Sequence, residues 1–226
     1  MSEDCYWVNI DTLDFFDPFD LGYGPRITES CGPAIAPMRA LYELIETDWK
    51  NSRLIFWSDQ CSISSDTKNP ALKELLKKNI PWVDWVLDNG RNFSGQFKEA
   101  DEDVKKMVES YLYDKEPPDE FGKQYIFNLK NPMEGLFERT GKDIRYTINL
   151  SKKVFYDIQT LGVYSYRIDR NGPLEINPLP FLLGLSNRNP LGDEHGMGPW
   201  VGDIVSVSNN RPDESFIEIH QMKIEW

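Results

Sequence analysis

The apolar residues of this 226-residue chain follow two different periodicities, one in each half, and these restrict the folds that it can adopt. Between residues 34 and 115 the apolar residues recur mainly at helical spacing. From residue 124 onward they alternate with polar residues, most clearly in 144–150, as in a half-buried strand. Segregated helices and strands favour an α+β fold. We therefore expect helices concentrated in the N-terminal half and a mainly antiparallel sheet in the C-terminal half.

Individual elements follow from the same patterns. Residues 1–33 are rich in Asp, Gly and Pro and predict a packed loop or short strands, and residues 82–86 form an aromatic patch that ends in a turn. Asn69 or Thr67 is expected to cap a helix that starts at Pro70. The other expected helices span 38–49 and 97–113, and the other expected strands span 54–57, 144–150, 154–156, 163–168, 204–207 and 216–224.

The domain organisation is set by one candidate boundary. Glu116-Pro117-Pro118-Asp119 separates a mixed, helix-rich region, 1–118, from a strand-rich region, 119–226. A chain of this length fits either one large domain or two small ones. The sequence leaves open whether the two regions form a single compact domain.

Charge and motifs exclude several classes of function. The net charge is −12, from 37 acidic and 25 basic residues, which opposes binding to nucleic acid or to anionic membrane surfaces. The chain has three cysteines, an odd number, and no C-x-x-C pair, so we expect neither a disulfide framework nor a zinc site. Glycine motifs that cradle phosphates are absent, so no cofactor is expected. No signal-peptide pattern opens the chain, which favours a cytoplasmic location.

One loop carries the candidate catalytic residues. In 187–203 a histidine lies beside carboxylates, and histidine is the usual general base near neutral pH. Asp193, His195 and Asp203 are therefore the catalytic candidates, and Arg188 and Trp200 are candidates for ligand binding. The alternative is an exposed, charged loop without chemistry. The Gly and Pro content of 187–200 predicts that this segment buries few apolar side chains.

Cys31 precedes the first expected helix. A thiol at a helix N-terminus has a lowered pKa, which activates many nucleophilic cysteines. The competing interpretation is that Cys31 fills a small apolar gap.

Acidic residues gather between 99 and 120. Asp101, Glu102 and Asp103 form the centre of a candidate binding face for a basic protein partner, because an acidic face steers such a partner toward it. The competing interpretation is that the acidity serves solubility.

A resemblance covers part of the second half. The segments 143–153, 176–183 and 200–207 resemble small uncharacterised bacterial proteins, some of immunity or mobile-element type. The resemblance implies a non-enzymatic protein that binds a partner. It implies no role for any single residue.

Together these features predict a cytoplasmic, acidic interaction protein, of immunity or inhibitor type, that binds a basic protein partner and not nucleic acid or a membrane. The alternative is a small hydrolase or ligand-binding enzyme with its site in the 187–203 loop. The oligomeric state is left open.

Overall fold

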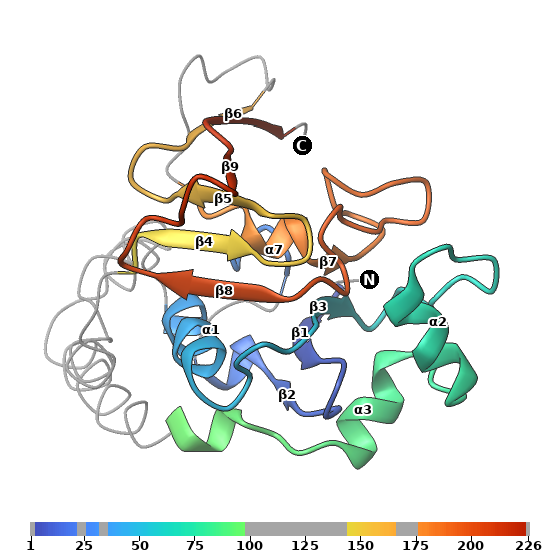
Figure 1. Ribbon diagram of the computed structural model, residues 1–226. Coiled ribbons are helices and arrows are strands. Elements are labelled where there is room, and N and C mark those ends of the chain that lie inside the picture. Colours follow the sequence, from blue (N-terminus) through green and yellow to red (C-terminus); the bar gives the residue numbers. More distant parts are fainter. Residues whose placement is uncertain (1–2, 22–25, 32–35, 98–143, 166–175, 225–226) are drawn as a thin grey trace, which may run out of the picture.

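The computed structural model describes residues 3–21, 26–31, 36–97, 144–165 and 176–224 (Figure 1). The fold is α+β, as predicted, although strands also occur in the N-terminal half. The helices are α1 (Ala36–Glu46), α2 (Pro70–Lys77), α3 (Val83–Asn89) and α7 (Leu179–Leu182). The strands are β1 (Cys5–Asn9), β2 (Phe15–Phe16), β3 (Leu54–Ser58), β4 (Tyr146–Asn149), β5 (Val154–Asp157), β6 (Gly162–Ser165), β7 (Gly184–Leu185), β8 (Val205–Ser208), β9 (Ile217–Glu218) and β10 (Gln221–Ile224).

The first sheet has the order β2-β1-β3-β7 and is buried on both faces. Its strands alternate between two clusters of apolar residues, because successive side chains point to opposite faces. On one face Trp7 stacks on Phe56, with ring centroids 4.3 Å apart, and this face packs with α1. On the other face Val8 and Trp57 pack with α2 and α3. The sheet is therefore the middle layer of the N-terminal half.

The second sheet has the order β8-β4-β5-β9. The predicted hairpin is confirmed, since β4 and β5 pair antiparallel with Thr147 opposite Tyr156. The predicted strand at 204–207 is confirmed as β8, which pairs with β4 and contacts α1. Figure 1 shows α1 between β8 and the first sheet. One large apolar cluster accordingly includes residues of both sheets.

The helix at Pro70 is confirmed, with Asn69 as its cap. The aromatic patch expected at 82–86, with a turn after it, is instead part of the helix α3 (Val83–Asn89), in which Val83 and Val86 are buried and Leu87 packs against the same apolar cluster. The predicted helix at 97–113 and the boundary at 116–119 lie outside the described residues. Within the described ranges, no helix is long and apolar enough to cross a membrane.

The C-terminal strand predicted at 216–224 is two short strands in different sheets. β9 pairs parallel with β5, and β10 pairs parallel with β6. The chain breaks at Ile219 and His220, where the backbone amide of Ile219 bonds to the carbonyl of Phe155 and the His220 carbonyl accepts from Gly162. A continuous alternating pattern cannot reveal such a change of partner, because both strands keep the same period.

A buried polar network joins α1 to the second sheet. The Tyr156 hydroxyl donates to Asn177 Oδ1 at 2.8 Å, and the Asn177 side-chain amide donates to the Tyr42 hydroxyl. Tyr42 also lies 3.4 Å from the Thr147 hydroxyl. Asn177 Oδ1 accepts from the backbone of Leu179 as well, at the start of α7. Asn177 is thus bonded to three separate elements.

We expect Asn177→Ala to lower the free energy of unfolding by about 3 kcal/mol, because it removes the side chain that bonds to two buried tyrosine hydroxyls and to one backbone amide. Tyr156→Phe, which removes a single hydroxyl, is expected to cost about 1 kcal/mol. Urea unfolding of the two variants tests this order. Equal losses would show that Asn177 does not hold the network.

Alkaline pH offers a second test of the same network. Burial raises the pKa of Tyr42 to about 12 from an ordinary value of 10.0. The folded state holds this proton more tightly, so the stabilisation is complete below pH 10 and is lost as pH rises toward 12. We expect Tyr42→Phe to flatten the fall in unfolding free energy between these pH values. Tyr164→Phe, at an exposed tyrosine, is the control and should leave the slope unchanged.

Candidate functional site

A pocket of about 390 Å³ opens where three distant segments meet. It is lined by residues 69–70 before and at the start of α2, by Lys152 in the β4–β5 turn, and by 191–193, 197–199 and 201–203. Its size lies within the usual range for small-molecule sites. Most of the pocket is therefore formed by the predicted 187–203 loop. Its other two walls, at the start of α2 and at Lys152, are far away in sequence and could not be predicted from it.

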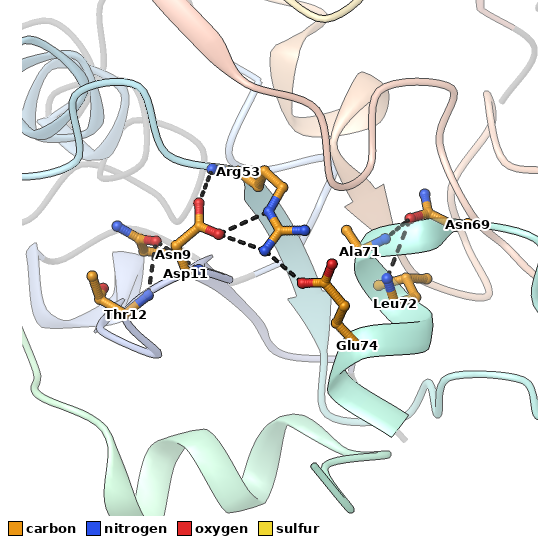
Figure 2. A network of polar contacts seen from close by, with 8 residues as sticks. All are labelled: Asn9, Asp11, Thr12, Arg53, Asn69, Ala71, Leu72 and Glu74. Carbon is orange, nitrogen blue, oxygen red and sulfur yellow. Dashed lines mark hydrogen bonds and ion pairs between the residues drawn. The ribbon is translucent and has the colours of Figure 1, made fainter. Parts of the chain in front are cut away.

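Asn69 fixes the α2 wall. Its Oδ1 accepts from the backbone amides of Ala71 and Leu72, at 3.0 and 3.2 Å, which caps the helix (Figure 2). Its Nδ2 donates to the Val201 carbonyl at 2.7 Å. Gly202, at φ +76°, comes so close to α2 that an added Cβ would lie 2.6 Å from Ala71 Cβ. The helix and the loop are thus joined at the edge of the pocket.

A second network braces α2 from the other side. The Arg53 guanidinium bonds to Asp11 Oδ1, with Nε at 2.8 Å, and to Glu74 Oε2 at 2.7 Å (Figure 2). The arginine holds the pKa of the Glu74 carboxyl below its ordinary value, by hydrogen bonding first and by its charge second. Arg53 also forms a β-bridge with Ile204, so this network reaches the residue after Asp203.

Asp203 is held by two partners. Its Oδ2 accepts from Asn149 Nδ2 at 2.7 Å and forms an ion pair with Lys152 Nζ. The Asn149 Oδ1 accepts from the backbone of Lys152 at 2.8 Å, which shapes the hairpin turn. The Asp203 side chain is mostly buried, and the Lys152 side chain is about half exposed. The negative charge of Asp203 and the positive charge of Lys152 therefore offset each other at one end of the pocket.

Asp193 also lines the pocket. Its Oδ1 accepts from the backbone amides of His195 and Met197, at 2.9 and 3.1 Å, in a tight loop. These two bonds orient the carboxylate. Asp193 and Asp203 thus line the same pocket. The alternative function, an enzyme with its site in the 187–203 loop, required them to lie together.

His195 is not among the lining residues. Its Nε2 lies 3.9 Å from Asp66 Oδ1 and 3.7 Å from Glu194 Oε1, two exposed carboxylates. Its backbone carbonyl accepts instead from the Cys61 thiol. The loop therefore directs the histidine away from the pocket that its neighbour Asp193 lines.

The other predicted residues have different positions. Arg188 is exposed, and its backbone amide donates to the Ser186 hydroxyl at 3.1 Å. Trp200 is 3% exposed and packs on Tyr156, with ring centroids 6.0 Å apart. Trp200 and Val201 belong to the core, so the expectation of little apolar burial in this loop is wrong. Asp101, Glu102 and Asp103 lie outside the described residues.

The cysteines are free and buried. Burial raises the pKa of the Cys31 thiol to about 11, and its Sγ donates to the Thr28 carbonyl. This shift is opposite to the one a nucleophile needs and favours the gap-filling interpretation. Burial, together with Glu3 and Asp193, also raises the pKa of Cys61 to about 11. Across the described ranges, no group of three or more His, Cys, Asp or Glu could hold a metal ion.

A second feature, which the sequence analysis missed, is the outer side of α3 and the residue before it. Trp82 and Trp85 are 42% and 40% exposed, while Val83 and Val86 are buried. The segment 82–90 contains Asp84 and Asp88 and no Lys or Arg. The spacing of the two tryptophans around Asp84 was the available signal. From the sequence alone, residues 82–86 are expected to form an aromatic patch and not a helix.

Tyr6 extends this surface onto the first sheet. Asp17 lies opposite Tyr6 by the register of β2, and Asp59 lies beside Asp4, whose backbone amide donates to Asp59 Oδ1 at 2.9 Å. The pKa of Tyr6 is raised to about 12, first by burial and then by the charges of four aspartates, which include Asp84 of α3. We call this set the aromatic–acidic surface: Tyr6, Trp82, Trp85, Asp4, Asp17, Asp59 and Asp84.

Comparison with known proteins gives no match to a family model, to a curated protein or to a solved structure. The function is therefore inferred from the geometry of the pocket and of the aromatic–acidic surface.

We expect Asn69→Ala to lower the free energy of unfolding by about 2 kcal/mol, since it removes both the cap of α2 and the bond to Val201. Asn69→Asp keeps the capping oxygen and loses only the donor, so it should retain about half of that stability. Thermal unfolding in parallel measures both. If the two variants were equally destabilised, the cap would contribute nothing.

Proposed function

We propose that this protein is a cytoplasmic interaction protein, of immunity or inhibitor type, and that it binds a basic protein partner through the aromatic–acidic surface. The observation that carries the proposal is the pair of exposed indoles, Trp82 and Trp85, on a surface where four aspartates lie around the phenol of Tyr6. Exposed tryptophans beside several negatively charged side chains do not contribute to core packing. Such a combination is typical of a binding surface.

The physical chemistry of the surface points to Lys and Arg. Indole faces attract ammonium and guanidinium groups through cation–π interactions, most strongly when the cation is partly desolvated. Aspartates at the rim attract the same groups over a longer range and raise the association rate. Tryptophan and tyrosine also lose little side-chain entropy on binding, and they are frequent anchors of interfaces. Each component of the surface therefore favours the same kind of partner.

The hydrolase alternative has less support. It relied on His195 as a general base beside Asp193 or Asp203, and a base must lie within hydrogen-bond reach of the group that it serves. The two carboxylates line the pocket, whereas His195 faces Asp66 and Glu194.

A hexa-arginine peptide is a direct probe of the proposed surface. We expect it to quench or shift tryptophan fluorescence and to bind more weakly as salt rises, because the attraction is screened over about 8 Å at physiological ionic strength. Trp82→Ala with Trp85→Ala should weaken binding about tenfold or more, and Asp84→Lys with Asp88→Lys should slow association.

The matched control is Glu46→Lys with Asp48→Lys. It changes the net charge equally, but it lies at the end of α1 and just after it, and α1 packs on the opposite face of the first sheet. Reversal of Asp101, Glu102 and Asp103 tests the face predicted from sequence. Equal effects of the α3 and α1 reversals would mean that only net charge matters, and would overturn the assignment to the aromatic–acidic surface.

A further inference from the structure

We infer that the pocket between α2, the β4–β5 turn and the 191–203 loop binds a small organic cation, with an ammonium or guanidinium head and a short apolar body. This site is separate from the aromatic–acidic surface and does not depend on the function proposed for it. The inference rests on the charges in the lining, on the unfilled bonding capacity of two carboxylates and on the apolar walls.

The balance of charge in the lining favours a cation. The charged groups are two carboxylates, Asp193 and Asp203, and one ammonium, Lys152. Lys152 is already paired with Asp203, so its charge is offset within the protein. The carboxylate of Asp193 has no such partner among the described residues, where its contacts are with backbone amides. A bound cation would supply the missing counter-charge.

Both carboxylates also keep one oxygen available. The two bonds to Asp193 go to Oδ1, and the two bonds to Asp203 go to Oδ2. In the part of the chain that the structure describes, Asp193 Oδ2 and Asp203 Oδ1 have no hydrogen-bond partner. Charged groups hydrogen-bond roughly twice as strongly as neutral ones, and an ammonium or guanidinium head carries several donors. The head of the ligand is therefore assigned to the carboxylates.

The remaining walls fit an alkyl body. Leu191, Met197, Pro199 and Val201 present apolar surface to the pocket. The lining is thus polar in one part and apolar in another, which suits a ligand with a charged head and a short apolar body. An anion is disfavoured, because the first free amides of α2 already bond to Asn69 Oδ1. A metal ion is disfavoured, because the described residues contain no group of three or more His, Cys, Asp or Glu that could hold one.

The test compares n-butylguanidinium with n-butylurea, which has nearly the same shape and no charge. Each is titrated into the intact chain and followed by two-dimensional amide NMR. We expect n-butylguanidinium to bind saturably with a Kd on the order of 1 mM and n-butylurea to bind about tenfold more weakly. The largest shifts should fall on residues 191–203. Equal binding of the two compounds, or shifts spread over acidic residues across the molecule, would overturn the inference.

Two variants change the charge of the pocket in opposite directions. Asp193→Asn keeps the Oδ1 acceptor and removes the charge, and it should weaken n-butylguanidinium binding about tenfold. Lys152→Met removes the ammonium and should tighten it. The control is Asp213→Asn, an exposed aspartate that also accepts a backbone amide, from Ser215.

The amide spectrum of each variant reports whether the fold is intact. Weaker binding in Lys152→Met, or no difference between Asp193→Asn and Asp213→Asn, would contradict the site. Trp82→Ala should leave n-butylguanidinium binding unchanged, so that failure here is distinguishable from failure of the proposed protein interaction.

Discussion

The bonds of Asn177 hold α1 against the four-stranded sheet that contains β4 and β5. A tyrosine from α1 and a tyrosine from β5 both bond to this one buried side chain, and its backbone amide donates to the Cys31 carbonyl at 2.6 Å. Hydrocarbon packing around the network is non-directional and tolerates small shifts of α1 against the second sheet. The hydrogen bonds do not, because a buried hydroxyl without a partner is costly.

The pocket lies at a second junction, between the first sheet and the loop before β8. The backbones of β3 and the loop before β8 meet through the bonds of Gly202 to Leu54 and of Leu54 to Asp203. This junction brings the end of the second sheet against α2, and the hairpin turn with Lys152 closes the remaining side. Asp203 is therefore held by Asn149 and Lys152 of the second sheet and its hairpin turn, whereas Asp193 is oriented by backbone amides of its own loop. A loop positioned in this way can present fixed chemistry.

The two proposed binding sites both favour cations, for related but separate reasons. The aromatic–acidic surface combines exposed indoles with four aspartates around one phenol, which suits a flexible basic segment of a protein. The pocket combines an oriented carboxylate with a lysine–aspartate pair, which suits one small charged head. The net charge of −12 supports both by long-range attraction. Local geometry distinguishes them, because net charge acts equally on every basic ligand.

The sequence by itself determined the elements whose signal is local. The face of α1, the start of α2 at Pro70 and the hairpin of β4 and β5 depend on spacing and on neighbouring residues, whereas the choice of Asn69 over Thr67 as the cap came from the structure. Only the tertiary structure decided which residues meet. It turned His195 away from Asp193, placed Trp200 in the core, divided the last strand between two sheets and joined Lys152 to Asp203 across 51 residues. The physical reason is that periodicity reports which side of an element is buried, whereas contacts between distant residues depend on how whole layers pack.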